Sequence, residues 1–155
     1  MTIAKQDVQY LTKEYKIFFC KNNIEIYEDE IDIKSHKKYF YAMKKYNDIP
    51  IITIDDDVIY DDDLLKTLYG AHLKFPNCVI SRRCHLMTYN ENNKIQSYKA
   101  WKYGYTKIQN TPSNKLFATG VGGILYPSNC INVNDIKIDD MLRCENDDML
   151  LKYHE

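Results

Sequence analysis

The chain has 155 residues, which is enough for a hydrophobic core, and we expect residues 1–155 to form a single domain. Its 21 basic and 22 acidic residues nearly cancel, which argues against general affinity for nucleic acid or an anionic membrane. The N-terminal sequence is charged, unlike a signal peptide or membrane span, and the five cysteines have no paired spacing. We therefore expect a cytoplasmic protein without a transmembrane segment, with reduced and mostly buried thiols.

The first third of the chain predicts helices alternating with strands. Apolar residues at three- and four-residue intervals predict a helix over residues 6–21, and a short strand follows at 22–28. Ser35 is a suitable N-cap for a helix over residues 35–46. The β-branched run at residues 49–54 is typical of a central strand that is covered on both faces.

A helix over residues 60–75 and a strand over residues 78–83 continue this alternation. Strands that alternate with helices predict an α/β fold with a parallel sheet and helices on both faces. Such a sheet normally begins with a strand, whereas the pattern here opens on a helix. We therefore expect the first strand–helix–strand unit of the sheet to be missing.

The second half of the chain is less regular. Residues 85–101 read as two extended segments around an Asn-rich turn, and residues 105–115 as a loop. Residues 116–127 predict an apolar strand interrupted by three glycines, and residues 144–155 predict a helix.

Three aspartates stand where the strand at residues 49–54 ends. Because strand side chains alternate, Asp55 and Asp57 should point to one side of the sheet's carboxyl edge and Asp56 to the other. Ligands bind at this edge of open α/β sheets, and two convergent carboxylates suit Mg²⁺ or Mn²⁺. The cation would offset the repulsion between the carboxylates and take its remaining ligands from water and a substrate diphosphate.

A second acidic triplet, Asp61 to Asp63, lies at the predicted start of the following helix. Side-chain oxygens there can cap free N–H groups, and the helix dipole favours negative charge. A structural role therefore explains this triplet.

An apolar strand that ends in D-x-D is used by two classes of enzyme, so the motif alone leaves alternatives open. A phosphatase of the haloacid dehalogenase type would use Asp55 as nucleophile and Asp57 as acid. Its later G-D-x-x-x-D motif is absent from the sequence. A non-catalytic domain that binds metal or sugar is a further alternative.

Several segments, taken in order, resemble bacterial glycosyltransferases of the GT-A fold, close to the family 2-like enzymes of surface polysaccharide synthesis. The matching segments are DIKSHKKYFYAMKKY, IPIITIDDDVIY, CVISRRCH, ATGVGGILYP and NDDMLLKY. The resemblance implies a partial GT-A, Rossmann-like sheet and a metal-dependent, inverting transfer. The donor would be a nucleotide-diphosphate sugar, and the acceptor a glycan or lipid-linked saccharide.

The resemblance also implies roles for residues on the donor side. Asp57 would ligate Mn²⁺ or Mg²⁺, and Asp55 would contact the donor ribose or share the metal. Asp56 is expected beside them at the donor. Lys37 and Lys38 stand where the family has basic residues near the donor diphosphate.

On the acceptor side, the family's acidic pair before an apolar helix corresponds to Asp147 and Asp148, with Asp148 as the expected catalytic base. Gly122 and Gly123 have little bulk and would allow close approach of a sugar. Trp101 would stack on an acceptor ring.

Relatives begin with a strand, a helix and a second strand that cradle the nucleobase, and they continue past the acidic pair. The match in this chain starts in the following helix, so we expect a domain truncated at its N-terminus. A completing subunit or a homo-oligomer would then supply the missing surface.

Overall fold

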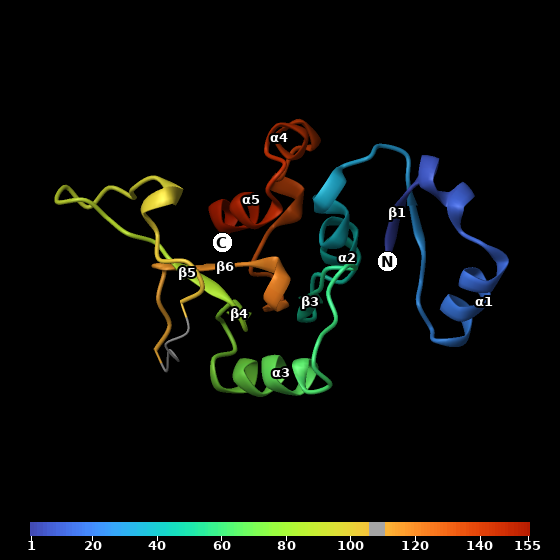
Figure 1. Ribbon diagram of the computed structural model, residues 1–155, viewed down its shortest axis with the longest axis horizontal. Helices are drawn as coiled ribbons and strands as arrows, with labels where there is room; N and C mark the ends of the chain where they lie inside the picture. Colours follow the sequence, from blue (N-terminus) through green and yellow to red (C-terminus); the bar gives the residue numbers. More distant parts are fainter. Residues whose placement is uncertain (106–110) are drawn as a thin grey trace.

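The structure is a computed structural model that describes residues 1–105 and 111–155. Three parts lie side by side: an N-terminal unit, a central sheet with its helices, and an outer hairpin (Figure 1). The predicted loop over residues 105–115 lies partly outside the described residues.

The N-terminal unit consists of two short parallel strands and the helices between them. Strand β1 (Thr2–Ala4) pairs with β2 (Tyr27–Asp29), with η1 (Lys5–Tyr10) and α1 (Lys13–Lys21) in the connection. The prediction that the chain opens on a helix is therefore wrong. A strand–helix–strand unit is present, but β1 and β2 form a sheet of their own and do not extend the central sheet.

The helix predicted over residues 6–21 is also divided, because a new helix starts in its middle. Thr12 has an extended backbone, and its side chain accepts a hydrogen bond from the backbone N–H of Tyr15 at the start of α1. This N-cap ends the preceding 3₁₀ turn and begins the α-helix.

The predicted helix over residues 35–46 is a 3₁₀ turn, η2 (Lys34–Lys38), followed by a short α-helix, α2 (Phe40–Lys45). Ser35 is not its N-cap. The Ser35 hydroxyl lies inside η2 and donates to the backbone carbonyl of Glu145, 2.9 Å away. The side chain therefore links two distant segments instead of capping its own helix.

The central sheet has the order β3 (Ile51–Thr53), β7 (Ile124–Tyr126), β4 (Ile80–Ser81), and β7 is antiparallel to both neighbours. The prediction of a parallel sheet with residues 49–54 at its centre is therefore wrong. The edge strands β3 and β4 share one direction, but β7, which is buried along its whole length, takes the central place.

Both faces of β7 are covered, as predicted for the sheet. Leu125 points to one face, where it packs with Leu64 and Leu68 of helix α3 (Leu64–Lys74). Ile124 and Tyr126 point to the other face and belong to the main core. The alternation of side chains along one strand thus builds a mixed α/β fold with helices on both sides.

The main core is completed by the C-terminal part of the chain. This part contains η5 (Val133–Asp135), α4 (Ile138–Arg143) and α5 (Asp147–His154). The side chain of Asn146 accepts a hydrogen bond from Met149 N–H, which begins α5 and confirms a helix in the predicted region. Helix α4 was not predicted.

The outer hairpin confirms in part the extended segments predicted over residues 85–101, because residues 98–100 form a 3₁₀ turn instead. Tyr89 pairs with Ile95 across a turn in which Asn93 has a positive φ of 54°. Strand β5 (Cys84–Leu86) then pairs with β6 (Leu116–Ala118) in an antiparallel sheet, and η3 (Tyr98–Ala100) lies between them in the chain.

The segment predicted as one strand over residues 116–127 is two strands in different sheets. Strands β6 and β7 are separated by the 3₁₀ turn η4 (Gly120–Gly122). Gly123, which follows the turn, has a φ of 76° that favours glycine. The glycines therefore redirect the chain from the outer hairpin into the central sheet.

The second acidic triplet lies directly before α3, as predicted, but its side chains do not cap the helix. Asp63 occupies the N-cap position without a side-chain hydrogen bond. Arg82 instead pairs with Asp61 at 2.9 Å and with Asp63 at 3.3 Å.

The five cysteines are free thiols, of which Cys20 is exposed and four are half-buried. The prediction that most of them are buried is therefore wrong. Among residues 1–105 and 111–155, no helix is long and apolar enough to cross a membrane.

Gly122 should matter for stability, because a Cβ there would lie 2.6 Å from Arg83 Cβ and 2.7 Å from Arg83 N. The backbone cannot yield easily, so we expect Gly122→Ala to lower the free energy of unfolding by about 1–3 kcal/mol. Gly70→Ala is the matched control, since a Cβ at this site in α3 meets nothing within 4 Å. It should raise stability by about 0.5–1 kcal/mol in the same urea titration. Equal effects of the two changes would contradict the packing of η4.

Candidate functional site

The ammonium group of Lys38, at the end of η2, lies between two carboxylates from distant parts of the chain. Its Nζ is 2.8 Å from Asp55 Oδ1 and 2.7 Å from Asp147 Oδ2. The three side chains are only 20%, 24% and 11% exposed, respectively. Partial burial makes this a stronger contact than an ordinary surface ion pair.

Asp148 joins this group through Gly120. The N–H of Gly120 donates to Asp148 Oδ2 at 2.9 Å. A Cβ built on Gly120 would lie 2.5 Å from Lys38 Nζ, 3.3 Å from Asp148 Oδ1 and 3.4 Å from Asp55 Oδ1. We call Lys38, Asp55, Asp147 and Asp148 the Lys38 cluster. Lys38, Asp55 and Asp148 meet at the Cβ position of Gly120, and Asp147 joins them through its ion pair with Lys38.

Local structure explains how each member reaches the cluster. Asp55 follows the end of β3, and its N–H donates to the Tyr60 hydroxyl at 3.0 Å, which holds the turn behind it. Asp147 and Asp148 occupy the first turn of α5, where the helix dipole favours negative charge. Gly120 begins η4, which follows β6.

Two hydrogen bonds, one part-buried and one exposed, fix η2 against the segment that leads into α5. His36 is fully buried, and its Nε2 lies 2.7 Å from the carbonyl of Cys144, while its Nδ1 lies 2.9 Å from the Tyr39 hydroxyl. The hydrogen bond from Ser35 to the Glu145 carbonyl lies beside it. Together they set the position of Lys38 relative to Asp147. The sequence reasoning missed His36, since no local pattern signals a contact with a partner more than 100 residues away.

The pKa values of Lys38 and Asp148 both lie above their ordinary values, but for different reasons. Burial alone would lower the pKa of Lys38, but Asp147, Asp55 and Asp148 outweigh it and hold this pKa above its ordinary value. Burial raises the pKa of Asp148, although the hydrogen bond from Gly120 works against it. Asp148 Oδ1 is buried and has no hydrogen-bond partner in the described part of the chain. Lys38 therefore stays protonated. Asp148 has one oxygen without a hydrogen-bond partner in the described part of the chain, and it binds a proton more readily than an ordinary aspartate.

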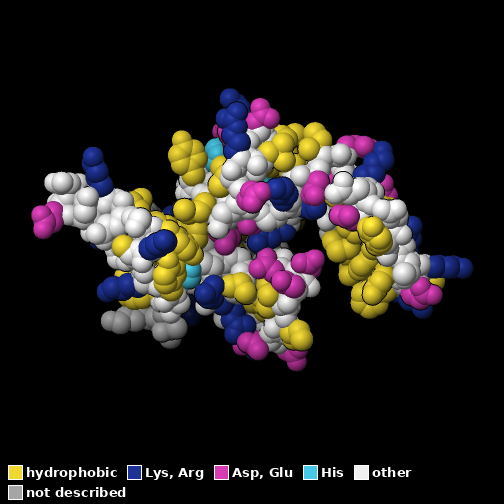
Figure 2. Space-filling model, turned by 45° about the horizontal axis from the view of Figure 1, so that its top comes forward, with side chains coloured by type: hydrophobic (Ala, Val, Ile, Leu, Met, Phe, Trp, Pro, Cys, Tyr) yellow, Lys and Arg dark blue, Asp and Glu magenta, His cyan; other side chains and the backbone are white. Residues whose placement is uncertain are grey.

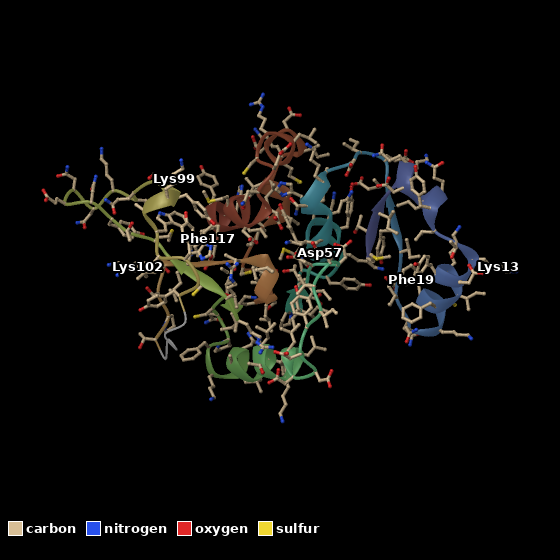
Figure 3. The ribbon with its side chains drawn as sticks, in the orientation of Figure 1. Lys13, Phe19, Asp57, Lys99, Lys102 and Phe117 are labelled. Atoms are coloured by element: carbon tan, nitrogen blue, oxygen red, sulfur yellow. The ribbon has the colours of Figure 1, made fainter. Side chains whose placement is uncertain are left out.

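The residues expected to hold a metal do not form such a site in this arrangement. Strand β3 ends at Thr53, so the alternation that placed Asp55 and Asp57 on one side does not extend to them. Asp55 is engaged by Lys38, whereas Asp56 and Asp57 are exposed in the turn that follows. Figure 3 shows Asp57 near the middle of the molecule. Within residues 1–105 and 111–155, no group of three or more His, Cys, Asp or Glu is arranged to hold a metal ion.

The other predicted donor residue, Lys37, lies outside the cluster. Its ammonium group pairs with Asp32 at 2.5 Å. The two adjacent lysines thus have different partners.

The glycines expected at the acceptor do not leave open space. The Cβ position of Gly122 is filled by Arg83, and a Cβ on Gly123 would lie 3.0 Å from Leu64 Cδ1. Their acceptor role stays a prediction. The prediction assumed that the missing side chains leave room for a sugar, and that room is filled by Arg83 and Leu64.

Trp101 is only 7% exposed, packs against Phe117, and donates from Nε1 to the carbonyl of Gln96 at 3.0 Å. It therefore belongs to the core of the outer hairpin. The neighbouring rings of Tyr98 and Tyr103 are 43% and 51% exposed and present aromatic surface that the sequence reasoning missed.

The space-filling view shows acidic side chains, with Lys or Arg among them, gathered near the middle of the molecule (Figure 2). A hollow separates this region from the N-terminal unit in the same view. Acidic and basic side chains are nearly equal in number over the whole chain, but in this view the acidic ones gather in one region.

No protein-family model matches the chain, and no curated protein or solved structure shows significant similarity to it. The resemblance to glycosyltransferases therefore rests on the sequence motifs alone. The contacts of the Lys38 cluster are the structural observations that bear on function.

The raised pKa of Asp148 predicts how stability depends on pH. An acid whose pKa is higher in the folded than in the unfolded chain binds more protons when folded, so the free energy of unfolding falls as pH rises through that pKa. Asp148→Asn removes this penalty while keeping an acceptor for the Gly120 N–H. The variant should be more stable than the wild type at pH 7, and its advantage should vanish as the pH falls toward 3.8, the ordinary value.

Urea unfolding at several pH values measures this difference. Asp140→Asn is the matched control, because Asp140 lies exposed in the first turn of α4. A destabilised Asp148→Asn at pH 7 would mean that the contacts of the carboxylate outweigh its burial.

Proposed function

We propose that this chain is a glycosyltransferase of the GT-A type that moves a sugar from a nucleotide-diphosphate donor to a hydroxyl of a glycan or lipid-linked saccharide. One observation carries the proposal. Asp55, which follows the D-x-D strand, and Asp148, from the acidic pair 93 positions later in the sequence, converge on Gly120 with Lys38 between them. The motif resemblance requires two separate acidic elements at one site, and the contacts bring them together.

Asp148 has the properties of the base that such a transfer needs. The acceptor hydroxyl gives its proton to Asp148 Oδ1 while its oxygen forms the new bond to the anomeric carbon. The bond from that carbon to the diphosphate breaks on the opposite face, so the configuration inverts. A base works best when its pKa approaches the working pH, and burial shifts Asp148 in that direction.

The remaining cluster residues support this role. Lys38 provides a positive charge close to the reacting groups, and it can stabilise the charge that develops on the departing diphosphate. Asp147 holds Lys38 in place through its 2.7 Å contact. Asp55 and the exposed Asp56 lie on the side where the donor is expected.

Several roles that the motif resemblance implies stay predictions from the sequence, and the proposal does not depend on them. They are the Mn²⁺ or Mg²⁺ ion, donor binding by Lys37, the acceptor roles of Gly122, Gly123 and Trp101, the role in surface polysaccharide synthesis, the cytoplasmic location, and a completing subunit or homo-oligomer.

A phosphatase is the second candidate, because the contact between Lys38 and Asp55 would also suit a nucleophilic carboxylate. This mechanism gives Asp148 no necessary role. Turnover of p-nitrophenyl phosphate with an acyl-phosphate on Asp55 would select it.

The test is turnover of a panel of nucleotide-diphosphate sugars, measured as release of the nucleoside diphosphate with and without saccharide acceptors. Asp148→Asn should reduce release at least about 100-fold, as expected for loss of a general base. Asp140→Asn should match the wild type. A folded Asp148→Asn protein with full activity would contradict the proposed base, and the absence of both turnover and nucleotide binding would favour the non-catalytic alternative.

A further inference from the structure

We propose that the Lys38 ammonium is the resident cation of the carboxylates Asp55, Asp147 and Asp148, and that this chain binds its donor diphosphate without a divalent metal. The inference rests on the proposed function for its choice of ligand. It departs from the metal-dependent chemistry that the sequence motifs predict.

The position of Nζ is the main observation. It lies within 2.8 Å of oxygens from two carboxylates, and the Cβ position of Gly120 brings Asp148 Oδ1 close to the same point. A metal bridging these carboxylates would have to occupy the space that the ammonium group fills. Two cations cannot share it without strong repulsion, so Lys38 and a divalent ion exclude one another there.

The contacts around η2 prevent Lys38 from withdrawing at little cost. His36 and Ser35 bind the carbonyls of Cys144 and Glu145, which lie just before α5. Lys38 therefore approaches the carboxylates from a tethered turn rather than from a mobile surface loop. Gly120 leaves room for it, since a Cβ there would lie 2.5 Å from Nζ.

The predicted metal ligands point to the same conclusion. Asp55 Oδ1 already accepts a hydrogen bond from Lys38, whereas Asp57 is exposed and forms no ion pair with Lys38 in the described part of the chain. Lys38 Nζ donates a hydrogen bond to Asp55 Oδ1 and forms an ion pair with Asp147 Oδ2. Because a lysine ammonium has three N–H donors, we expect one of them to donate to a phosphate oxygen.

The experiment compares Lys38→Met with Lys44→Met. Lys44 is exposed in α2 and lies outside the cluster, so its variant controls for the loss of one positive charge. Binding of the diphosphates of adenosine, cytidine, guanosine, thymidine and uridine is measured by calorimetry in EDTA and in Mn²⁺. Mn²⁺ binding is measured separately by electron paramagnetic resonance without nucleotide, and thermal melting confirms that each variant is folded.

For the wild type, we expect nucleotide affinity in EDTA to lie within twofold of that in Mn²⁺. Lys38→Met should weaken binding at least tenfold in EDTA, whereas Lys44→Met should change it less than threefold. The three carboxylates are not arranged to hold a metal ion in the wild type. Without the ammonium group between them, we expect them to close on Mn²⁺ and to bind it at least tenfold more tightly in Lys38→Met than in the wild type. Mn²⁺ should then raise the melting temperature of this variant alone.

Two results would overturn the inference. One is wild-type nucleotide binding that requires Mn²⁺ and is lost on Asp57→Ala, which would restore the predicted metal site. The other is equal Mn²⁺ affinity of the wild type and Lys38→Met. If no nucleotide binds under any condition, the proposed function fails, but the Mn²⁺ titration still decides whether Lys38 and the metal compete.

Discussion

The site depends on the partial burial of one ammonium group among three carboxylates. Like charges placed so close together repel one another strongly in a partly dry environment, and removal of the central cation would leave that repulsion unbalanced. Lys38 provides the balance for Asp55, Asp147 and Asp148, which come from the end of β3 and the start of α5. The pair interactions also keep Lys38 charged, although burial opposes this.

The fold around the cluster has the features needed to maintain it. Strand β7 forms the centre of the sheet, with α3 on one face and the main core on the other. The turn η4, which leads into β7, places Gly120 against the charged groups. On the opposite side, His36 and Ser35 bind η2 to the segment before α5. The same contacts that close the core thus fix the distance between the cation and its partners.

Local patterns predicted much of the secondary structure. The segments that form β3, α3, β4 and α5 could be predicted from the sequence. The spacing of apolar residues, and the Asn, Pro and Asp residues at the ends of helices and strands, act over only a few residues. The short strand β1 was missed because its three residues carry too little pattern beside the charged helical sequence that follows. Thr12 divides that sequence by capping α1, a choice that periodicity does not reveal.

Long-range arrangement could not be predicted in the same way. Nothing in the run at residues 49–54 shows that β7 will pair beside it in the antiparallel sense, since pairing depends on a strand more than 70 residues away. The motif resemblance does select Asp55, Lys38 and Asp148, which lie close together in the structure. It could not show that Lys38 would occupy the place between the carboxylates, because the position of an ammonium group is set by tertiary contacts of η2.

We propose that the Lys38 cluster receives the donor diphosphate beside Asp148. The decisive measurement is a crystal structure of the chain with a bound nucleoside diphosphate. We expect a phosphate oxygen about 3 Å from Lys38 Nζ, with Asp148 still bonded to the N–H of Gly120. A diphosphate bound elsewhere on the chain, or Asp148 separated from Gly120 and Asp55, would contradict it.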